Sequence, residues 1–243
     1  MTTRIDLAEL RSVGGFFALR QGPAPEGAVA FSQVYAPPAG PDPLSSRVAE
    51  VARRLGAPEE RVAVSVAHLG LAARVWSVGL GCAALYGAVP DLDPARLRWD
   101  ARATSPDDLW LGDVRALPVG ADPDAAAATV RDAVQRAHLV PLAEALRARY
   151  RISAGLLWGN AGSALAGAAR ELRGWAARER REGVGERALR LAEVLFDHPD
   201  LRTTGALDPA AFRRRSCCLY YRCPAGGVCG DCCFERPPTR SSP

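Results

Sequence analysis

The sequence predicts a mainly α-helical protein of the α+β class, with a helical domain, a small β-hairpin element and a C-terminal cysteine-rich tail. Three observations lead to this prediction. Apolar residues recur every three or four positions through several segments of residues 59–212. Two short segments of alternating character bracket a turn-rich stretch near residue 104. Six of the seven cysteines lie between Cys217 and Cys233.

The composition excludes several classes of protein. The chain has 243 residues, enough to bury a core, and its mean hydropathy of −0.06 argues against an integral membrane protein. It contains no lysine, which excludes P-loop nucleotide hydrolysis and pyridoxal chemistry. The net charge of +4 is too small to indicate nucleic-acid binding by itself.

The N-terminus lacks the pattern of a secretory signal. Asp6 and Glu9 stand where a signal peptide needs an apolar stretch. We therefore expect a cytoplasmic protein in a reducing compartment, where a six-cysteine disulfide framework is disfavoured. The odd number of cysteines supports the same interpretation.

Residues 1–58 are expected to form an N-terminal extension of loops and short elements, because prolines interrupt them repeatedly between residues 23 and 43. The chain becomes helical after that point. Ser45 and Ser46 are candidates to cap a short helix that runs to Leu55 and stops at Gly56.

The helical domain is expected over residues 59–212. Residues 62–89 carry one formal charge, Arg74, and this pattern predicts a buried core helix with a break near residues 79–81. A transmembrane span is not expected, because Arg74, His68 and several glycines interrupt the apolar stretch that a bilayer requires.

The rest of the domain alternates between a hairpin and helices. Segments 97–101 and 109–114 flank a turn at residues 104–108, which predicts a β-hairpin. The apolar periodicity predicts further helices at about residues 123–138, 141–150, 157–175 and 186–196.

The tail, residues 213–243, contains the pattern Cys217-Cys218-x10-Cys229-x2-Cys232. Thiolate is the ligand that both iron–sulfur centres and structural zinc prefer. A CxxC pair forms a tight chelate loop in which both sulfurs converge on one metal. The tail is therefore predicted to bind a soft metal or a cluster.

Spacing alone leaves two kinds of site open. Neighbouring side chains of an extended strand point to opposite faces, so Cys217 and Cys218 can face one ion only on a distorted backbone. A two-iron centre relaxes this demand, because its ligands are spread over two metals. The alternative is zinc, with the ligands Cys218, Cys223, Cys229 and Cys232. That alternative predicts a zinc-binding interaction module for nucleic acid or a protein partner.

The segment from Arg214 to Arg222, together with Cys229-Gly-Asp-Cys232, resembles the C-terminal signature of the FhuF-like ferric siderophore reductases. Their CC-x10-CxxC motif is matched here without a gap. A less specific similarity includes segments 68–77, 89–99 and 156–168, so the resemblance covers residues 60–235 approximately.

The resemblance implies a [2Fe–2S] cluster whose ligands are Cys217, Cys218, Cys229 and Cys232. Two further cysteines, Cys223 and Cys233, depart from the family pattern, as does Ala225 in a turn that is usually rich in glycine. We interpret these two cysteines as buried or spare thiols; the alternative is that one of them replaces a motif cysteine as a ligand.

The resemblance also implies an enzyme, an iron–sulfur oxidoreductase that reduces Fe(III) in ferric siderophores of the hydroxamate type. One-electron transfer gives Fe(II) and releases iron inside the cell. The chain has no GxGxxG nucleotide motif, so a separate donor such as a ferredoxin or an NAD(P)H-dependent reductase is expected. No nucleic-acid partner is expected. A simple electron carrier without its own substrate is a third hypothesis.

Other candidate residues follow from their positions. Arg222, between the cysteine pairs, is the arginine expected to stabilise the reduced cluster, whereas Arg213–Arg215 fit that role and a solvated surface equally. Asn160 is a candidate substrate contact. Core positions are expected for His68, Cys82, Trp76, Trp99, Trp110 and Trp158, and helix-end positions for His138 and His198.

Overall fold

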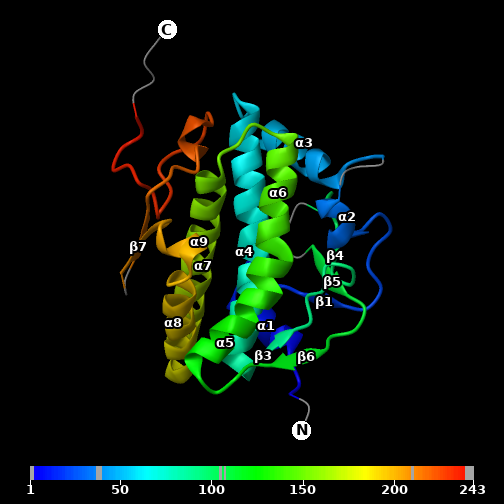
Figure 1. Ribbon diagram of the computed structural model, residues 1–243, viewed down its shortest axis with the longest axis vertical. Coiled ribbons are helices and arrows are strands. Elements are labelled where there is room, and N and C mark those ends of the chain that lie inside the picture. The colour runs from blue at the N-terminus through cyan, green and yellow to red at the C-terminus, as the bar shows by residue number, and fades with distance from the viewer. Residues whose placement is uncertain (1–2, 37–39, 104–105, 107, 209–210, 239–243) are drawn as a thin grey trace.

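The computed structural model describes residues 3–36, 40–103, 106, 108–208 and 211–238. It confirms a mainly α-helical fold with small β elements (Figure 1). The helical elements are α1 (Leu7–Val13), η1 (Gly15–Phe17), α2 (Phe31–Tyr35), α3 (Pro43–Leu55), α4 (Glu60–Tyr86), α5 (Pro123–Val130), η2 (Arg131–Leu139), α6 (Val140–Arg149), α7 (Ala154–Arg178), α8 (Glu182–Phe196), α9 (Pro199–Arg202) and η3 (Tyr220–Arg222). The strands are β1 (Arg20–Gln21), β2 (Val29–Ala30), β3 (Ala88–Pro90), β4 (Arg98–Trp99), β5 (Leu109–Leu111), β6 (Ala116–Pro118), β7 (Gly205–Asp208) and β8 (Ala211–Arg214).

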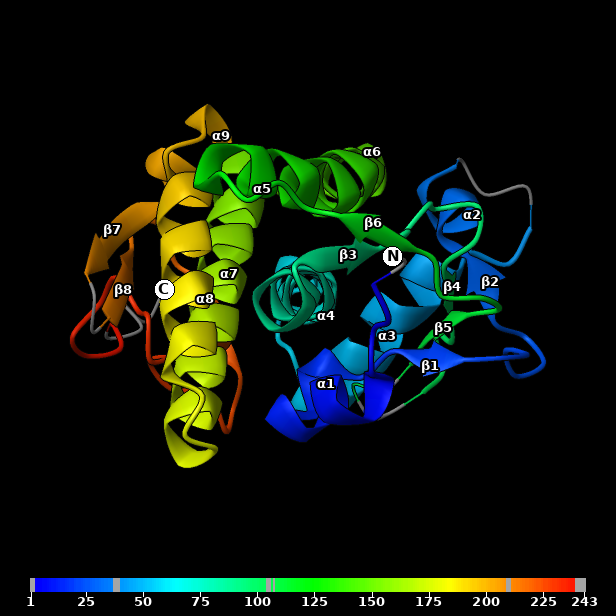
Figure 2. The ribbon, with the colours of Figure 1, turned by 90° about the horizontal axis from the view of Figure 1, so that it is seen from below.

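Helix α4 is the centre of the fold and is apolar on all sides. Figure 2 shows it nearly end-on, with α7 and α8 on one side and the four-stranded sheet on the other. It is long and apolar enough to cross a bilayer, but 78% of its most apolar window is buried inside the structure, as expected for a core helix. Its one interior charge, Arg74, is neutralised by the buried Asp108, with Nε 2.6 Å from Oδ1.

The predicted break near residues 79–81 is wrong, because α4 continues to Tyr86. Glycine weakens a helix in isolation, which is why the sequence indicates a break there. In the fold, Gly79 allows η2 to approach closely, since a Cβ at this position would overlap the side chain of Val134. Tertiary packing therefore overrides the local propensity.

The two helices predicted at 123–138 and 141–150 form one continuous rod made of α5, η2 and α6 (Figure 1). Its middle part, η2, has π-helical hydrogen bonding. Pro141 lies two residues after the end of η2; it has no N–H to donate and its ring disfavours a regular α-turn before it. The wider π-turn accommodates the proline without ending the helix.

The predicted β-hairpin is confirmed, with β4 antiparallel to β5 and Trp99 opposite Leu109. Part of its turn, residues 104, 105 and 107, lies outside the described residues. The hairpin belongs to a four-stranded sheet of order β1-β5-β4-β2, whose two outer strands come from the N-terminal segment. The sequence did not reveal this pairing, because β1 and β2 are only two residues long.

The N-terminal segment is part of the core. Leu10 of α1, Phe17 of η1 and Phe31 of α2 are buried. The predicted capping residue of the next helix is wrong: Asp42 caps α3, and its Oδ1 accepts the N–H of Leu44 at 3.1 Å. The division of the chain at residues 58 and 212 stays a prediction.

His138 is buried within the continuous helix that α5, η2 and α6 form, rather than at a helix end, so its predicted position is wrong. Its Nε2–H donates to the carbonyl of Leu92 at 2.6 Å, and its Nδ1 accepts the hydroxyl of Tyr35 at 2.7 Å. The neutral ring is thus fully bonded. Burial lowers the pKa of His138 to about 4.

This histidine will destabilise the fold in acid. In the unfolded chain this imidazole binds a proton near pH 6.5, whereas in the folded chain it does so only near pH 4. As the pH is lowered between these values, His138 therefore reduces the free energy of unfolding by about 1.4 kcal/mol per pH unit. His138→Gln keeps a donor and an acceptor but cannot titrate. Urea unfolding at several pH values is expected to show a shallower slope for this variant. Identical slopes for the two proteins would contradict the assignment.

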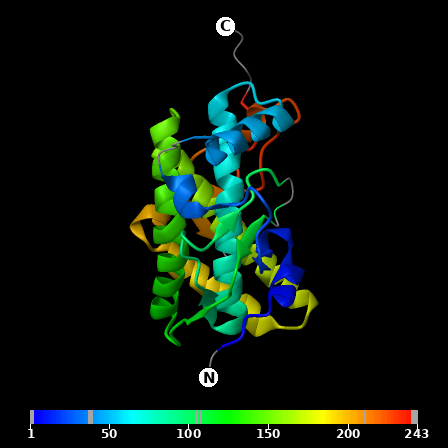
Figure 3. The same ribbon diagram turned by 90° about the vertical axis from the view of Figure 1, so that its right-hand side faces the viewer.

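The hairpin β7–β8 lies against α7 and is followed by the cysteine segment, residues 217–233. Figures 1 and 3 both place that segment at the end of the molecule where α3 meets α4. Gly162 of α7 makes the contact possible, because a Cβ there would overlap the Thr204 hydroxyl and lie 3.3 Å from the ring of Phe212.

Gly162→Ala is therefore expected to destabilise the protein relative to Gly167→Ala. Both changes add the same methyl group to the same helix, but at Gly167 the nearest atom is Nη2 of Arg170, 3.9 Å away. The gain in helix propensity cancels in the comparison, which leaves an overpacking cost of about 1–3 kcal/mol at Gly162. Chemical denaturation of the two variants measures this difference, and equal stabilities would show that the contact has no role.

Candidate metal centre

The backbone is distorted directly after the first cysteine pair, Cys217 and Cys218. β8 ends at Arg214, and the chain reverses after Cys218 at Leu219, whose φ of 67° lies in the left-handed region. A leucine there costs about 1–2 kcal/mol, so the surrounding contacts must hold it. The sequence predicts that two neighbouring cysteines need such a distortion to face one centre, and the structure places it immediately after them.

Two sulfurs of the motif already have the separation that a metal requires. Sγ of Cys218 lies 3.8 Å from Sγ of Cys229. Two thiolates bound at about 2.3 Å to one tetrahedral metal are about 3.8 Å apart. The sulfurs of Cys217 and Cys232 each accept a bond from the backbone N–H two residues further along the chain, at 3.2 and 3.4 Å. Such N–H···S bonds stabilise a thiolate ligand.

The donor set at this end of the molecule consists of sulfur. Cys218 is buried, whereas Cys217, Cys229 and Cys232 are partly exposed. Hydrogen bonds with Cys217 and Cys229 lower the pKa of Cys218, and the same bonds, together with burial, raise the pKa of those two thiols. Among the described residues, no three His, Cys, Asp or Glu side chains converge as a site for a single ion. The adjacent sulfurs fit the chemistry of an iron–sulfur centre.

A buried positive charge lies beside these cysteines. Arg214 is 2% exposed; its Nε donates to the carbonyl of Ser216 at 2.9 Å and its Nη2 to Oδ1 of Asn160 at 2.6 Å. Its Nη1 is buried without a partner, and Arg214 forms no ion pair within the described part of the chain. Burying an uncompensated charge costs several kcal/mol, so an anionic metal–thiolate group is the counter-charge that this position lacks.

Two polar side chains join Arg214 to the first cysteine pair. Ser65 of α4 donates to the carbonyl of Cys218 at 2.8 Å, and Asn160 of α7 donates through Nδ2 to the carbonyl of Ser65 at 2.9 Å. All of these side chains are buried. The prediction that Asn160 contacts substrate is therefore wrong: its amide orients Arg214 and links α4 to α7.

Asp231, between the cysteines of the CxxC pair, fastens this loop to α7. Its Oδ2 accepts the hydroxyl of Ser163 at 2.5 Å, and its Oδ1 lies 2.9 Å from Nη1 of Arg170. Its carbonyl also accepts the N–H of Arg214 at 2.9 Å. Sequence reasoning missed Asp231, Ser65 and Ser163, because none of them has a local pattern that indicates such a role.

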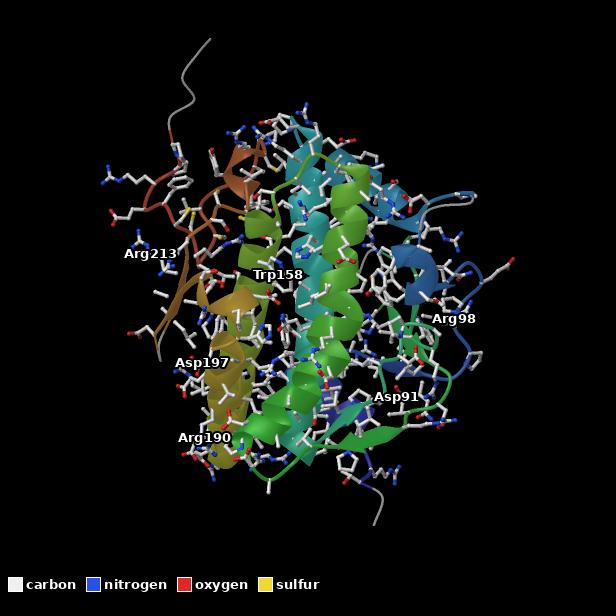
Figure 4. The ribbon with its side chains drawn as sticks, in the orientation of Figure 1. Asp91, Arg98, Trp158, Arg190, Asp197 and Arg213 are labelled. Carbon is white, nitrogen blue, oxygen red and sulfur yellow. The ribbon has the colours of Figure 1, made fainter. Side chains whose placement is uncertain are left out.

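The structure favours a different arginine from the one predicted. Arg222 pairs with Glu59 and lies over the ring of Tyr221 at 5.7 Å. Arg213 lies at the outer edge of the β7–β8 hairpin (Figure 4), and its side chain is 58% exposed. Only Arg214 of the two strand arginines points inward. Strand alternation contains this signal, because Phe212 and Arg214 are both buried along β8.

Most of the other residues singled out in the sequence lie in the core or at a helix end. Trp76, Trp99, Cys82 and His68 are buried in the core as predicted, whereas Trp110 and Trp158 are only partly buried. Burial, with a smaller contribution from Arg214, lowers the pKa of His68 to about 3. His198 lies at a helix end, as predicted, but it caps the start of α9, a helix that the sequence did not predict, and there accepts the N–H of Asp200 at 3.3 Å.

Two family models match the chain. The first, described as a ferric iron reductase FhuF-like transporter, matches residues 71–214, more than half of the sequence. The second, described as the FhuF 2Fe-2S C-terminal domain, matches residues 214–234 and thus all six clustered cysteines. No curated protein matches the sequence. The chain therefore belongs to the FhuF-like ferric iron reductase family, and its C-terminal segment is a [2Fe–2S]-binding domain.

Proposed function

We propose that this protein reduces Fe(III) in ferric siderophores to Fe(II) by one-electron transfer and so releases iron in the cytoplasm. The observation that carries the proposal is the [2Fe–2S]-binding segment fastened to α7 of a ferric-reductase domain, with three of its four motif cysteines partly exposed. Siderophores hold Fe(III) through hard oxygen donors and hold Fe(II) far more weakly. A single electron is therefore enough to release the metal.

In this proposal Cys217, Cys218, Cys229 and Cys232 bind the cluster, which supplies a one-electron carrier when it is present. The separation of 3.8 Å between two of the sulfurs supports this set. The two extra cysteines differ in their surroundings. Cys223 is buried after η3, and its carbonyl accepts the N–H of Gly226 at 2.9 Å. Cys233 is partly exposed, and its thiol hydrogen-bonds with that of Cys232. We assign both Cys223 and Cys233 as spare thiols.

The residues around the cysteines then have defined tasks. Arg214 places a buried positive charge beside four thiolates and so favours the reduced state. Asp231 fixes the CxxC loop to α7 through Ser163 and Arg170. The partly exposed cysteines allow an electron to enter from a separate donor, such as a ferredoxin or an NAD(P)H-dependent reductase.

A single-turnover reaction tests the proposed function. The holoprotein is reduced with dithionite, desalted anaerobically and mixed with ferric desferrioxamine B and an Fe(II) chelator. We expect oxidation of the protein and trapping of one Fe(II) per chain at the same rate, and no Fe(II) with the Cys229→Ser variant. A reduced protein that keeps its spectrum in the presence of the ferric complex would refute the proposal and leave the electron-carrier hypothesis.

A further inference from the structure

A cavity lies on the α4–α7 face of the molecule, next to the cysteine segment but separate from it. It has a volume of about 360 Å³, within the range of small-molecule sites. Its walls come from three elements that are distant in the sequence: η1 with Phe16, α4 with Leu69 and Ala73, and α7 with Ser163 and Gly167. The family models do not assign a role to it.

Two residues connect this cavity to the CxxC loop. Ser163 and Arg170 both line the cavity, and both also bind the carboxylate of Asp231, at 2.5 and 2.9 Å. Asp231 follows Cys229 by two residues and directly precedes Cys232. Asp231 thus places the loop that carries two of the proposed ligands in direct contact with the wall of the cavity.

We propose that this cavity is where the ferric siderophore binds for reduction. The inference rests on the proposed function and adds the location of its substrate. One electron leaves the reduced protein through the Cys229–Cys232 loop and enters Fe(III), so the protein is oxidised and the iron reduced. No covalent bond forms or breaks in the protein, and no proton needs to move.

The chemistry of the cavity suits a ferric complex of low net charge with apolar linking arms. Its two charged lining residues, Arg170 and Glu171, have opposite signs, and Arg170 is already paired with Asp231. Phe16 at its edge is 44% exposed, an unusual position for an aromatic ring, and offers an apolar face to a ligand. A strongly anionic complex would find no unpaired cation on these walls.

Two other cavities in the described part of the chain are less suitable. One of about 340 Å³ lies beside Gly87 at the C-terminal end of α4, whereas Glu59, next to the N-terminal end, pairs with Arg222 of the cysteine segment. A helix of 27 residues separates these ends by about 40 Å. Another, of about 250 Å³, lies on the far side of Phe16 among Arg47, Arg54 and Arg74, and lacks a contact with the CxxC loop.

Filling the cavity tests the proposal. Gly167→Leu extends a side chain into it, and a Cβ at this position meets only Nη2 of Arg170 at 3.9 Å. Gly174→Leu is the matched control, because Gly174 is on the same helix, is also partly buried and does not line the cavity. Ala73→Leu fills the same space from α4 and serves if Gly167→Leu folds poorly.

Binding is measured by calorimetry with gallium(III) desferrioxamine B, a redox-inert analogue, on the oxidised holoprotein. The wild-type and Gly174→Leu proteins are expected to bind it equally, and Gly167→Leu or Ala73→Leu at least tenfold more weakly. Oxidation of the reduced variants by subsaturating ferric desferrioxamine B should slow by the same factor. Their oxidation by ferricyanide should not change, which shows that the electron carrier is intact.

The outcomes separate the two proposals. If ferric desferrioxamine B oxidises the wild type and both filled variants equally fast, the cavity is not the binding site and the proposed function stands. If it does not oxidise the wild type at all, the proposed function fails, and the inference fails with it. Gallium binding that is weakened in Gly167→Leu and Ala73→Leu, but not in Gly174→Leu, supports the assigned site.

Discussion

Replacing Cys229 with serine will remove the visible absorbance and the reduced-state EPR signal of the [2Fe–2S] cluster, whereas replacing Cys233 will leave both unchanged. Sγ of Cys229 already lies 3.8 Å from Sγ of Cys218, the separation expected for two ligands of one metal. A serine hydroxyl does not supply the soft anionic donor that the cluster needs. Cys233 lies outside the CC-x10-CxxC pattern.

Matched variants at every clustered cysteine make this prediction decisive. Serine at Cys217, Cys218 or Cys232 should behave like serine at Cys229. Serine at Cys223 should behave like serine at Cys233. Iron and sulfide contents measured after anaerobic purification give the result independently of optical spectra. A full cluster in the Cys229→Ser protein, or its loss in the Cys233→Ser protein, would contradict the ligand assignment.

The second large effect is expected at Arg214, where Arg214→Met will lower the reduction potential of the cluster. The arginine is buried and forms no ion pair with the residues that the structure describes, so its charge acts through protein rather than through water. At a separation of about 8 Å and an effective dielectric constant of about 20, one charge contributes about 2 kcal/mol, which corresponds to about 90 mV. Spectroscopic redox titration measures the shift.

Two further variants separate charge from packing. Arg213→Gln removes a neighbouring arginine whose side chain is 58% exposed, and water should screen its effect on the potential almost completely. Arg214→Lys keeps the charge but loses the guanidinium group that donates to Asn160 and Ser216. Its reduction potential should therefore be close to that of the wild type, whereas its stability should be lower. Equal potentials for Arg214→Met and wild type would exclude an electrostatic role for this residue.

Much of the helical fold could be predicted from the sequence, because long apolar periodicity dominates over local detail. The long segment around Leu157 and Trp175 is α7, and the β-hairpin formed where alternation indicated it. The failures have different causes. The continuity of α4 through Gly79 depends on close packing against Val134, and the capping of α3 depends on Asp42, just before the residues that the pattern favoured.

The site could be predicted only as far as its cysteines. Their spacing and family resemblance indicated the cluster, and the matching [2Fe–2S] domain confirms the cofactor. The surroundings depend on tertiary contacts between distant residues: Ser65 and Asn160 meet across α4 and α7, and Asp231 meets Ser163 across 68 residues of chain. Arg222 was favoured by its place between the cysteine pairs, but strand alternation directs Arg214 inward instead.

The most direct test of the central claim is a count of iron, sulfide and electrons in the anaerobically purified chain. Four cysteine ligands and a one-electron role predict about two irons and two sulfides per chain, a brown colour, and reduction by one electron in a coulometric titration. The Arg214 and cavity variants then have a defined centre to act on. A colourless protein that contains one zinc and no sulfide, and takes up no electron, would contradict the account.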